Sequence, residues 1–255
     1  MILVIDIGNS NITFGIFDGE KLVKKFCLPS NFGVPDEEYL RLIKAQTAEF
    51  DISGCFIASV VTGLDLRFKK FLDSALNINS LVLTNDLPLG LKILTDIPSE
   101  LGADRIANSI GAVEMFKENC IIVDFGTATT VEIVTKNKEF LGGIITAGIN
   151  IQLDALSSKT SKLPKIKVSA PRKLIATDTK DAMLSGVIYG TAAMAEGIVR
   201  RYQEVLKPEK FIVIATGGQA EFIAKYTDNL FDCVVPDLTL WGLLKIQERI
   251  SAECI

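Results

Sequence analysis

The chain begins with a short apolar run, residues 2–5, which ends at the polar sequence DIGN of residues 6–9. Alternating and β-branched residues resume at 11–17 and 21–28, and Asp18-Gly19 between them is a hairpin turn signal. Three extended segments joined by short polar turns predict an antiparallel meander at the start of the chain.

Helical spacing of apolar residues follows the meander. Residues 36–50 and 64–76 show it, and a further helix is expected to begin near Asp104. Between and after these helices, the apolar runs 55–60 and 80–84 predict strands. A meander followed by alternating helices and strands is typical of an α/β domain.

The same order restarts at residue 120. Residues 120–123 form an apolar run that ends at DFGT, residues 124–127, and extended patterns follow at 129–134 and 139–146. The remaining pattern predicts helices at 150–156, 178–205 and 238–250, a helix after TGG at 216–218, and strands at 211–215 and 234–235.

This recurrence predicts an internal duplication: a two-lobed α/β fold in which each lobe is a mixed sheet with a three-strand meander and flanking helices. The expected lobes are residues 1–116 and 117–255. An apolar strand followed by Asp-x-Gly is also a common turn, so coincidence is the alternative. The glycine pair at 142–143 and TGG at 216–218 favour duplication.

Composition narrows the class of protein. Of 255 residues, 48% are apolar and 7% aromatic, which is typical of a packed α/β protein. The net charge is −4 and no run of Lys and Arg stands out, so no nucleic-acid partner is expected. An anionic ligand would therefore be bound by backbone amides, metal and a few placed cations.

Neither a signal peptide nor a membrane span is expected. The amino terminus lacks a basic region and Asp6 interrupts its apolar run, and no stretch of about twenty apolar residues occurs. The odd, scattered set of cysteines indicates reduced thiols in a cytoplasmic protein; they are Cys27, Cys55, Cys120, Cys233 and Cys254.

The chain contains no histidine. This excludes a Ser-His-Asp triad, a Cys-His pair and a histidine zinc site. A general base must then be a carboxylate, Lys, Tyr, Cys or the α-amine. Candidate chemistry is therefore sought among carboxylates beside special backbone turns.

Two loops with the same design could bind phosphate. In the first, Asp6 ends a strand, Gly8 allows a tight turn, and Asn9, Ser10 and Asn11 offer donors. The second, DFGTATT at 124–130, repeats the design with more hydroxyls. Two such loops, one in each expected lobe, would bind a triphosphate from two sides, and the carboxylate of Asp6 could hold Mg²⁺ through water. Hairpin turns with local capping are the alternative.

Two further segments are candidates. Thr216-Gly217-Gly218 lies between a strand and a helix, where glycines admit a ligand close to the backbone. In the sequence LGADR, Asp104 and Arg105 either cap a helix and contact solvent, or act as a base for an alcohol and a grip for an acidic group. No GxxxxGK[ST] motif is present, which excludes a P-loop kinase.

Together these motifs resemble the actin-like (ribonuclease H-like) superfamily of acetate and sugar kinases, Hsp70 and actin. Their set and order resemble, more narrowly, the type III pantothenate kinase family over nearly the whole chain. The segments that carry the resemblance are DIGNSNIT at 6–13, LGADRIAN at 101–108, DFGTATT at 124–130, LGG at 141–143, LP at 163–164, TGG at 216–218 and LTLWGL at 238–243.

The resemblance implies a role for each of these segments. It implies ATP binding by Asp6, Ile7, Gly8, Asn9, Ser10, Asn11, Ile12, Thr13 and Thr127. It implies pantothenate binding by Gly102, Ala103, Asp104, Arg105 and Thr179, with Asp104 as the catalytic base, and a monovalent cation (K⁺ or NH₄⁺) at Asp124.

The implied reaction uses ATP and Mg²⁺ to make 4′-phosphopantothenate, the first step of coenzyme A biosynthesis. The implied protein is a cytoplasmic homodimer whose acceptor site lies at the subunit interface. The alternatives are a kinase of the same fold for another acidic or sugar acceptor, a non-catalytic regulator that keeps the fold, and a hydrolase of polyphosphate or nucleotide.

Overall fold

The computed structural model describes residues 1–31, 33–84 and 86–253. Their contacts define two compact units. Unit 1 comprises Met1–Lys92, Asp96–Met115 and Leu238–Ile255, and unit 2 comprises Ile93–Thr95 and Phe116–Asp237. Each unit is described by itself below.

Unit 1 is built on a five-stranded sheet in the order β3-β2-β1-β4-β5. Its strands are β1 (Ile2–Ile7), β2 (Asn11–Asp18), β3 (Lys21–Pro29), β4 (Gly54–Ser59) and β5 (Ser80–Val82). Its helices are α1 (Asp36–Thr47), α2 (Leu64–Leu76), α3 (Ala103–Phe116) and α7 (Leu238–Glu253), with a 3₁₀ turn, η1, at Pro98–Glu100.

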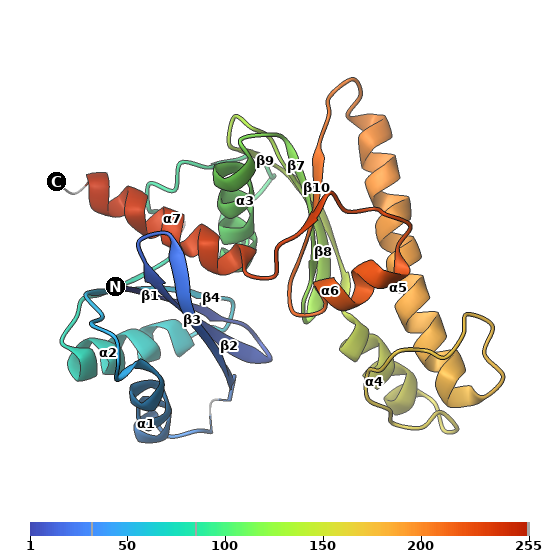
Figure 1. Ribbon diagram of the computed structural model, residues 1–255, viewed down its shortest axis with the longest axis horizontal. Coiled ribbons are helices and arrows are strands. Elements are labelled where there is room, and N and C mark those ends of the chain that lie inside the picture. The colour runs from blue at the N-terminus through green and yellow to red at the C-terminus, as the bar shows by residue number, and fades with distance from the viewer. Residues whose placement is uncertain (32, 85, 254–255) are drawn as a thin grey trace. The chain divides into compact units, whose positions relative to one another are not determined.

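Alternation along the strands decides which helices cover which face of this sheet. Phe14 on β2 packs with Ile43 of α1 and Phe68 of α2 in one buried cluster, and both helices lie on that side of the sheet in Figure 1. The next residue, Gly15, points to the other face, where a Cβ would lie 3.0 Å from Leu240 of α7. The sheet is therefore buried on both faces.

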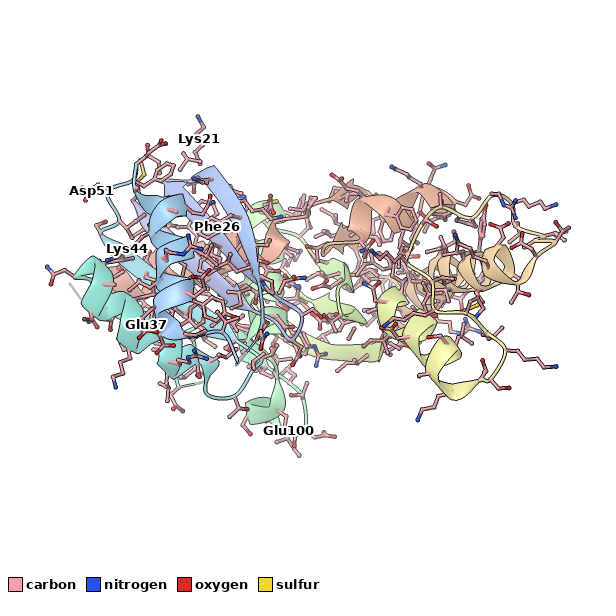
Figure 2. All side chains as sticks on the ribbon, turned by 90° about the horizontal axis from the view of Figure 1, so that it is seen from below. Lys21, Phe26, Glu37, Lys44, Asp51 and Glu100 are labelled. Carbon is pink, nitrogen blue, oxygen red and sulfur yellow. The ribbon has the colours of Figure 1, made fainter. Side chains whose placement is uncertain are left out.

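The surface of unit 1 is charged and its interior aromatic. Phe26 of β3 stacks on Phe14 with the ring centroids 4.5 Å apart. The charged side chains labelled on unit 1 in Figure 2 are all exposed; they are Lys21, Glu37, Lys44, Asp51 and Glu100.

Unit 2 repeats this plan. Its sheet has the order β11-β10-β7-β8-β9-β6. The strands are β6 (Lys92–Ile93), β7 (Cys120–Phe125), β8 (Ala128–Val134), β9 (Glu139–Ala147), β10 (Ile212–Thr216) and β11 (Cys233–Val234). The helices are α4 (Ile149–Lys159), α5 (Thr179–Val205) and α6 (Ala220–Ile223), and η2 (Ala224–Tyr226) is a 3₁₀ turn.

One buried cluster joins these helices to the unit 2 sheet. Val123 of β7 and Val131 of β8 pack with Leu153 of α4, Ile188 of α5 and Ala220 of α6. In Figure 1 all three helices lie on the same side of this sheet. Their apolar faces therefore bury one face of the central strands.

The strand orders confirm the predicted duplication. The series β3-β2-β1-β4-β5 and β9-β8-β7-β10-β11 have the same connectivity, and β6 is an addition to the second. The expected lobes 1–116 and 117–255 remain a prediction. The compact units are interleaved, because α7 belongs to unit 1 although it ends the chain.

Element types were mostly predicted correctly, and the differences have local causes. The helix expected over 36–50 ends at Thr47, where the Thr47 hydroxyl donates to the carbonyl of Ile43 and Phe50 N–H closes a turn on Thr47. The helix after TGG is a single turn continued by η2. The two-residue strand β6 carries no periodic signal and was not predicted.

The described cysteines are free thiols, as predicted: Cys27, Cys55, Cys120 and Cys233. Cys254 lies outside the described residues. Burial raises the pKa of Cys55 and of Cys120 to about 12, so both thiols stay protonated and unreactive.

Helix α5 is long and apolar enough to cross a membrane by length and composition. Half of its most apolar window is buried, and Leu184 and Ile188 belong to the core of unit 2. The core helix of a soluble protein passes the same test, so this helix is weak evidence for a span.

Helices α3 and α7 of unit 1 touch through glycines, which yields a prediction. A Cβ on Gly242 would overlap the carbonyl oxygen of Ala107, and one on Gly111 would lie 2.8 Å from the carbonyl oxygen of Leu238. Gly242→Ala should therefore lower the free energy of unfolding by about 1–3 kcal/mol through overpacking. Denaturant unfolding monitored by the fluorescence of Trp241 measures it.

Gly190→Ala on α5 is the matched control, because a Cβ there meets nothing within 4 Å. Its expected effect is a gain of up to about 1 kcal/mol from helix propensity. Equal stabilities of the Gly242→Ala variant and the unmodified protein would contradict the close packing of α3 and α7.

Candidate active site

The first candidate loop joins β1 to β2 in unit 1. Gly8 N–H donates to the carbonyl of Asn11 at 3.0 Å and closes the turn. A Cβ on Gly8 would lie 3.1 Å from that oxygen, so the turn favours glycine. The side chains of Asn9, Ser10 and Asn11 are exposed and can donate hydrogen bonds to an anion. Asp6 stands where β1 ends, beside Thr13 of β2 and Ala58 of β4.

The second candidate segment begins helix α3 of unit 1. One carboxylate oxygen of Asp104 accepts the N–H of Arg105 at 2.8 Å. A Cβ on Gly102 would lie 2.6 Å from the same oxygen, so any larger residue at this position would displace the carboxylate. Burial raises the pKa of Asp104 above its ordinary value, and the contacts with Arg105 oppose that shift. A carboxylate with a raised pKa is a better proton acceptor near neutral pH.

Val60 connects these two segments within unit 1. Its N–H donates to the carbonyl of Ile7 at 3.0 Å, at the start of the β1–β2 loop. Its side chain lies 3.6 Å from the Cβ position of Gly102. The structure therefore brings the predicted phosphate loop and the predicted acceptor turn to the same end of the unit 1 sheet.

Asp124 ends the central strand β7 of unit 2. In the sheet register it stands opposite Thr130 of β8 and beside Thr216 of β10, so the three side chains point to the same face. The hydroxyl oxygens of Thr130 and Thr216 are buried and have no hydrogen-bond partner in the described part of the chain. A buried unpartnered hydroxyl is costly unless a ligand completes it.

Several backbone segments approach the carboxylate of Asp124 closely. Gly217 has φ +90°, and a Cβ there would overlap a carboxylate oxygen of Asp124 and lie 2.8 Å from Phe125 N. Gly148 N–H donates to the carbonyl of Thr127 at 3.1 Å, and Gln219 N–H to that of Phe125 at 3.1 Å. Three segments of unit 2 thus converge at the end of β7, and Thr127 stays exposed among them.

The oxygen-rich surroundings of Asp124 fit a hard cation. One carboxylate and two unpartnered hydroxyls are ligands that alkali and alkaline-earth ions prefer. Among residues 1–31, 33–84 and 86–253, no cluster of three His, Cys, Asp or Glu side chains could hold a metal ion. Zinc and other transition metals prefer nitrogen and sulfur ligands, so this all-oxygen donor set suits a hard cation better.

Thr179 is the first residue of α5 and lies exposed in unit 2. Asp178 caps this helix by accepting the N–H of Asp181 at 3.0 Å, and this hydrogen bond lowers the pKa of Asp178. The buried Asp181 in turn accepts the N–H of Arg172 at 2.8 Å. These bonds tie the segment before Thr179 to the first turn of the helix.

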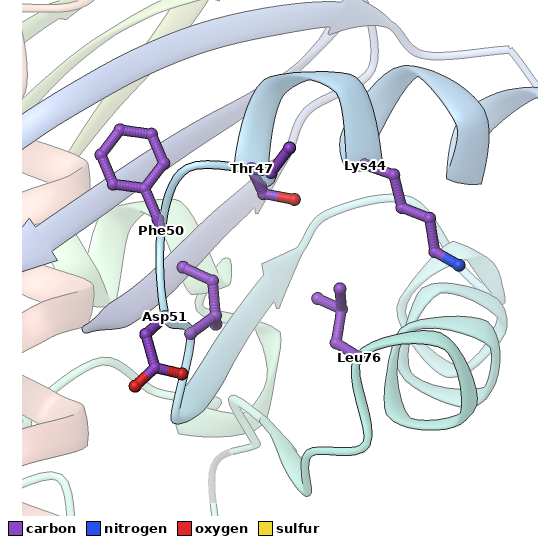
Figure 3. A pocket seen from close by; sticks show the side chains of 7 residues that line it. Lys44, Thr47, Phe50, Asp51 and Leu76 are labelled. Atoms are coloured by element: carbon purple, nitrogen blue, oxygen red, sulfur yellow. The ribbon is translucent and has the colours of Figure 1, made fainter.

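Two cavities bear on the placement of the predicted residues. One, of about 490 Å³ in unit 2, is lined by Arg172, Asp178, Lys180 and Asp181 and so surrounds the start of α5. The other, of about 380 Å³ in unit 1, lies between the ends of α1 and α2 (Figure 3). Lys44, Phe50 and Asp51 line it, and it contains none of the predicted site residues.

The structure therefore groups the predicted residues in three places. Asp6–Thr13 and Gly102–Arg105 share one end of the unit 1 sheet, Asp124 and Thr127 share one end of the unit 2 sheet, and Thr179 lies at the start of α5. The positions of Thr130 and Thr216 beside Asp124 were not predicted, since only the strand register reveals them. Asp181 was also missed, although the Asp-x-x-Asp spacing from Asp178 is a capping signal.

The fold identifies the class of protein. The chain matches an archaeal actin homologue (12% identity, TM-score 0.54, 97% of this chain and 99% of that one). It also matches the ethanolamine utilization protein EutJ of Carboxydothermus hydrogenoformans (13% identity, TM-score 0.55, 94% and 88% covered). The protein thus has the actin-like ATPase fold, as expected from the sequence.

The family follows from closer relatives. The sequence profile of type III pantothenate kinase matches residues 2–201, and a type III pantothenate kinase of Bacillus cytotoxicus is 38% identical over 98% of this chain and 96% of its own length. The chain belongs to the type III pantothenate kinase family. A protein of Campylobacter jejuni described as a Baf family transcriptional activator is 26% identical, with TM-score 0.61 and 98% and 99% of the two chains covered.

The raised pKa of Asp104 predicts a dependence of stability on pH. The folded state holds this proton more tightly than the unfolded state, so stability falls as pH rises above the unfolded-state pKa and levels off above the folded-state pKa. Asp104→Asn removes that loss. Its Tm at neutral pH should exceed that of the unmodified protein by about 2 °C or more, and the difference should shrink toward acidic pH.

Thermal unfolding of both proteins between acidic and neutral pH, followed by circular dichroism, measures this difference. Asp232→Asn is the matched control, because Asp232 also accepts a backbone N–H, that of Val213 at 2.8 Å. That variant shows what the loss of a carboxylate that accepts a backbone N–H does to Tm by itself. A constant Tm difference for Asp104→Asn at every pH would contradict the burial argument.

Proposed function

We propose that the protein transfers the γ-phosphoryl group of ATP to the primary hydroxyl of pantothenate, as the first step of coenzyme A biosynthesis. Membership of the type III pantothenate kinase family supports the activity. The single structural observation that carries the assignment of roles is the half-buried carboxylate of Asp104, with its raised pKa, adjoining the β1–β2 loop through Val60.

In this proposal Asp104 is the base. The hydroxyl oxygen of pantothenate forms a bond to the γ-phosphorus, the bond from that phosphorus to the bridging oxygen of ADP breaks, and the hydroxyl proton passes to Asp104. Arg105, the next residue of α3, binds the carboxylate of pantothenate in a bidentate pair. Gly102 and Ala103 leave the acceptor access to both side chains.

The glycine turns hold the nucleotide in this proposal. Exposed donors of the β1–β2 loop, residues 6–13, bind phosphate oxygens, and Thr127 does so at the end of β7. Asp6 orients Mg²⁺ through water, and Asp124 with Thr130 and Thr216 holds a potassium or ammonium ion. These cations supply positive charge that offsets the charge of the phosphates.

The same proposal places the protein in the cytoplasm as a homodimer whose acceptor site includes Thr179 of the partner subunit. Support comes from Leu174 and Ile175, which are 61% and 83% exposed just before Thr179. Large apolar side chains this exposed on one short segment indicate a protein interface. Their position beside Thr179 would bring that residue to a second copy.

A regulatory role without catalysis is the second candidate, and the similarity to the Baf family activator favours it. A protein that only binds ligands needs no base. The combination of Asp6, Asp104, Arg105 and Asp124 favours the kinase, because an idle site has no physical need for three carboxylates beside glycine turns.

An ADP-release assay with ATP, Mg²⁺ and pantothenate should show turnover that depends on pantothenate and that falls strongly when sodium replaces potassium. Asp104→Asn should reduce kcat about 10²-fold or more while leaving ATP binding intact, because only proton transfer is lost. ADP release without pantothenate would indicate a hydrolase. Absence of any release would favour the regulator.

Mixing two inactive variants tests the shared acceptor site. Asp104→Asn and Thr179→Ala should each have low activity, and co-refolding them should restore about a quarter of the activity of the unmodified dimer, because each mixed dimer has one intact site. Co-refolding Asp104→Asn with Arg105→Ala is the control and should restore nothing. No recovery with Thr179→Ala, or a monomer in sedimentation velocity, would contradict the dimer.

A further inference from the structure

The connection from α4 to α5 is unusually long and rich in positive charge. Residues 160–178 form no helix or strand. Loops beyond about 12–15 residues without such structure are uncommon in compact domains and are usually functional or disordered. Residues 159–180 are called the basic arm below.

The basic arm is held to unit 2 at both ends. Leu163, Ile166 and Val168 pack against the core of the unit. Near its end, Arg172 N–H donates to Asp181, and the Ser185 hydroxyl donates to the carbonyl of Leu174 at 2.6 Å. The arm is therefore a surface segment whose backbone is held against unit 2, as opposed to a flexible linker.

Charge on the arm opposes that of the remaining chain. It contains seven Lys and Arg residues and one carboxylate, a formal charge of +6, so with a total of −4 the other residues carry −10. The cations are spaced two to five residues apart over most of the arm, which is why no consecutive run marks them in the sequence. All seven are exposed; they are Lys159, Lys162, Lys165, Lys167, Arg172, Lys173 and Lys180.

The arm's own carboxylate neutralises little of this charge. Arg172 pairs with Asp178 and approaches Asp181 at 3.7 Å. None of the six lysines forms an ion pair within the described residues. Neighbouring lysines two or three residues apart on an extended chain lie about 7–10 Å from each other, within about one Debye length at 0.1 M salt. Their potentials therefore add.

We propose that the basic arm guides the anionic acceptor to the start of α5. This inference rests on the proposed function, in which Thr179 contacts pantothenate. The arm leads directly to Thr179, and Arg172 and Lys180 line the cavity of about 490 Å³ there. Since the rest of the chain is negative and repels carboxylates, a local positive potential raises the concentration of the acceptor where it binds.

The test is a charge-neutral variant of the arm, Lys162→Gln with Lys165→Gln and Lys167→Gln. None of these residues belongs to the proposed binding site. At low ionic strength, with ATP saturating, kcat/KM for pantothenate should fall about threefold or more with kcat unchanged. Raising ionic strength to about 0.3 M with choline chloride, at constant potassium, should abolish the difference, because the Debye length then falls below 10 Å.

Two matched variants isolate the position and the charge. Lys70→Gln with Lys210→Gln and Lys225→Gln changes the net charge equally at exposed lysines outside the arm, and should leave kcat/KM unchanged. Replacing Lys162, Lys165 and Lys167 by Arg keeps the charge and should keep the activity and its salt dependence. Equal Tm values for all three variants exclude misfolding.

Identical kcat/KM for the arm variant and the scattered variant at every ionic strength would overturn the guiding role while leaving the kinase assignment intact. A loss that persists at high salt would also overturn it, because a direct contact would then be responsible. Absence of pantothenate-dependent turnover in the unmodified protein would overturn both. If a double-stranded DNA column retains the unmodified protein but not the arm variant, the ligand of the arm is a polyanion and the proposal of a small anionic acceptor is overturned.

Discussion

Strand β7 is paired on both edges, antiparallel to β8 and parallel to β10, and the shared register places Thr130 and Thr216 beside Asp124. A strand that is paired on both edges and buried on at least one face has no alternative backbone pairing. The direction of the Asp124 side chain near its end is therefore fixed. The turns that follow β9 and β10 must then pass close to the residues at the end of β7, which Gly148 and Gly217 permit. In unit 1 the same pairing of β1 with β2 and β4 positions Asp6.

This constraint explains which parts of the protein could be predicted from the sequence. The strands that end in Asp6 and Asp124 are continuous apolar runs, so both the duplication and the two carboxylates were evident. The roles of Thr130 and Thr216 depend on which residues stand opposite Asp124, and no local pattern encodes a cross-strand register. Asp104 was predicted as a base from its motif, but its burial, which raises its pKa, is a property of the folded unit.

The candidate site combines residues that cost stability with residues that bind ligands. Asp104 loses hydration in the folded state, and the hydroxyls of Thr130 and Thr216 lie buried without described partners. Each of these groups would be better satisfied in water than in the folded interior. Ligands that supply a hydrogen-bond donor to Asp104, or a cation or a phosphate oxygen to the two hydroxyls, recover that free energy, so binding and stability are linked in this protein.

The interleaving of the two units has a consequence for biosynthesis on the ribosome. Unit 2 consists almost entirely of one continuous segment, so its core can form as soon as that segment has emerged. Unit 1 takes its last helix, α7, from the final residues of the chain, and that helix covers the sheet face that Gly15 presents. During translation β1 and β2 must therefore wait for α7, and the sheet face that this helix covers stays open to chaperones until α7 has emerged.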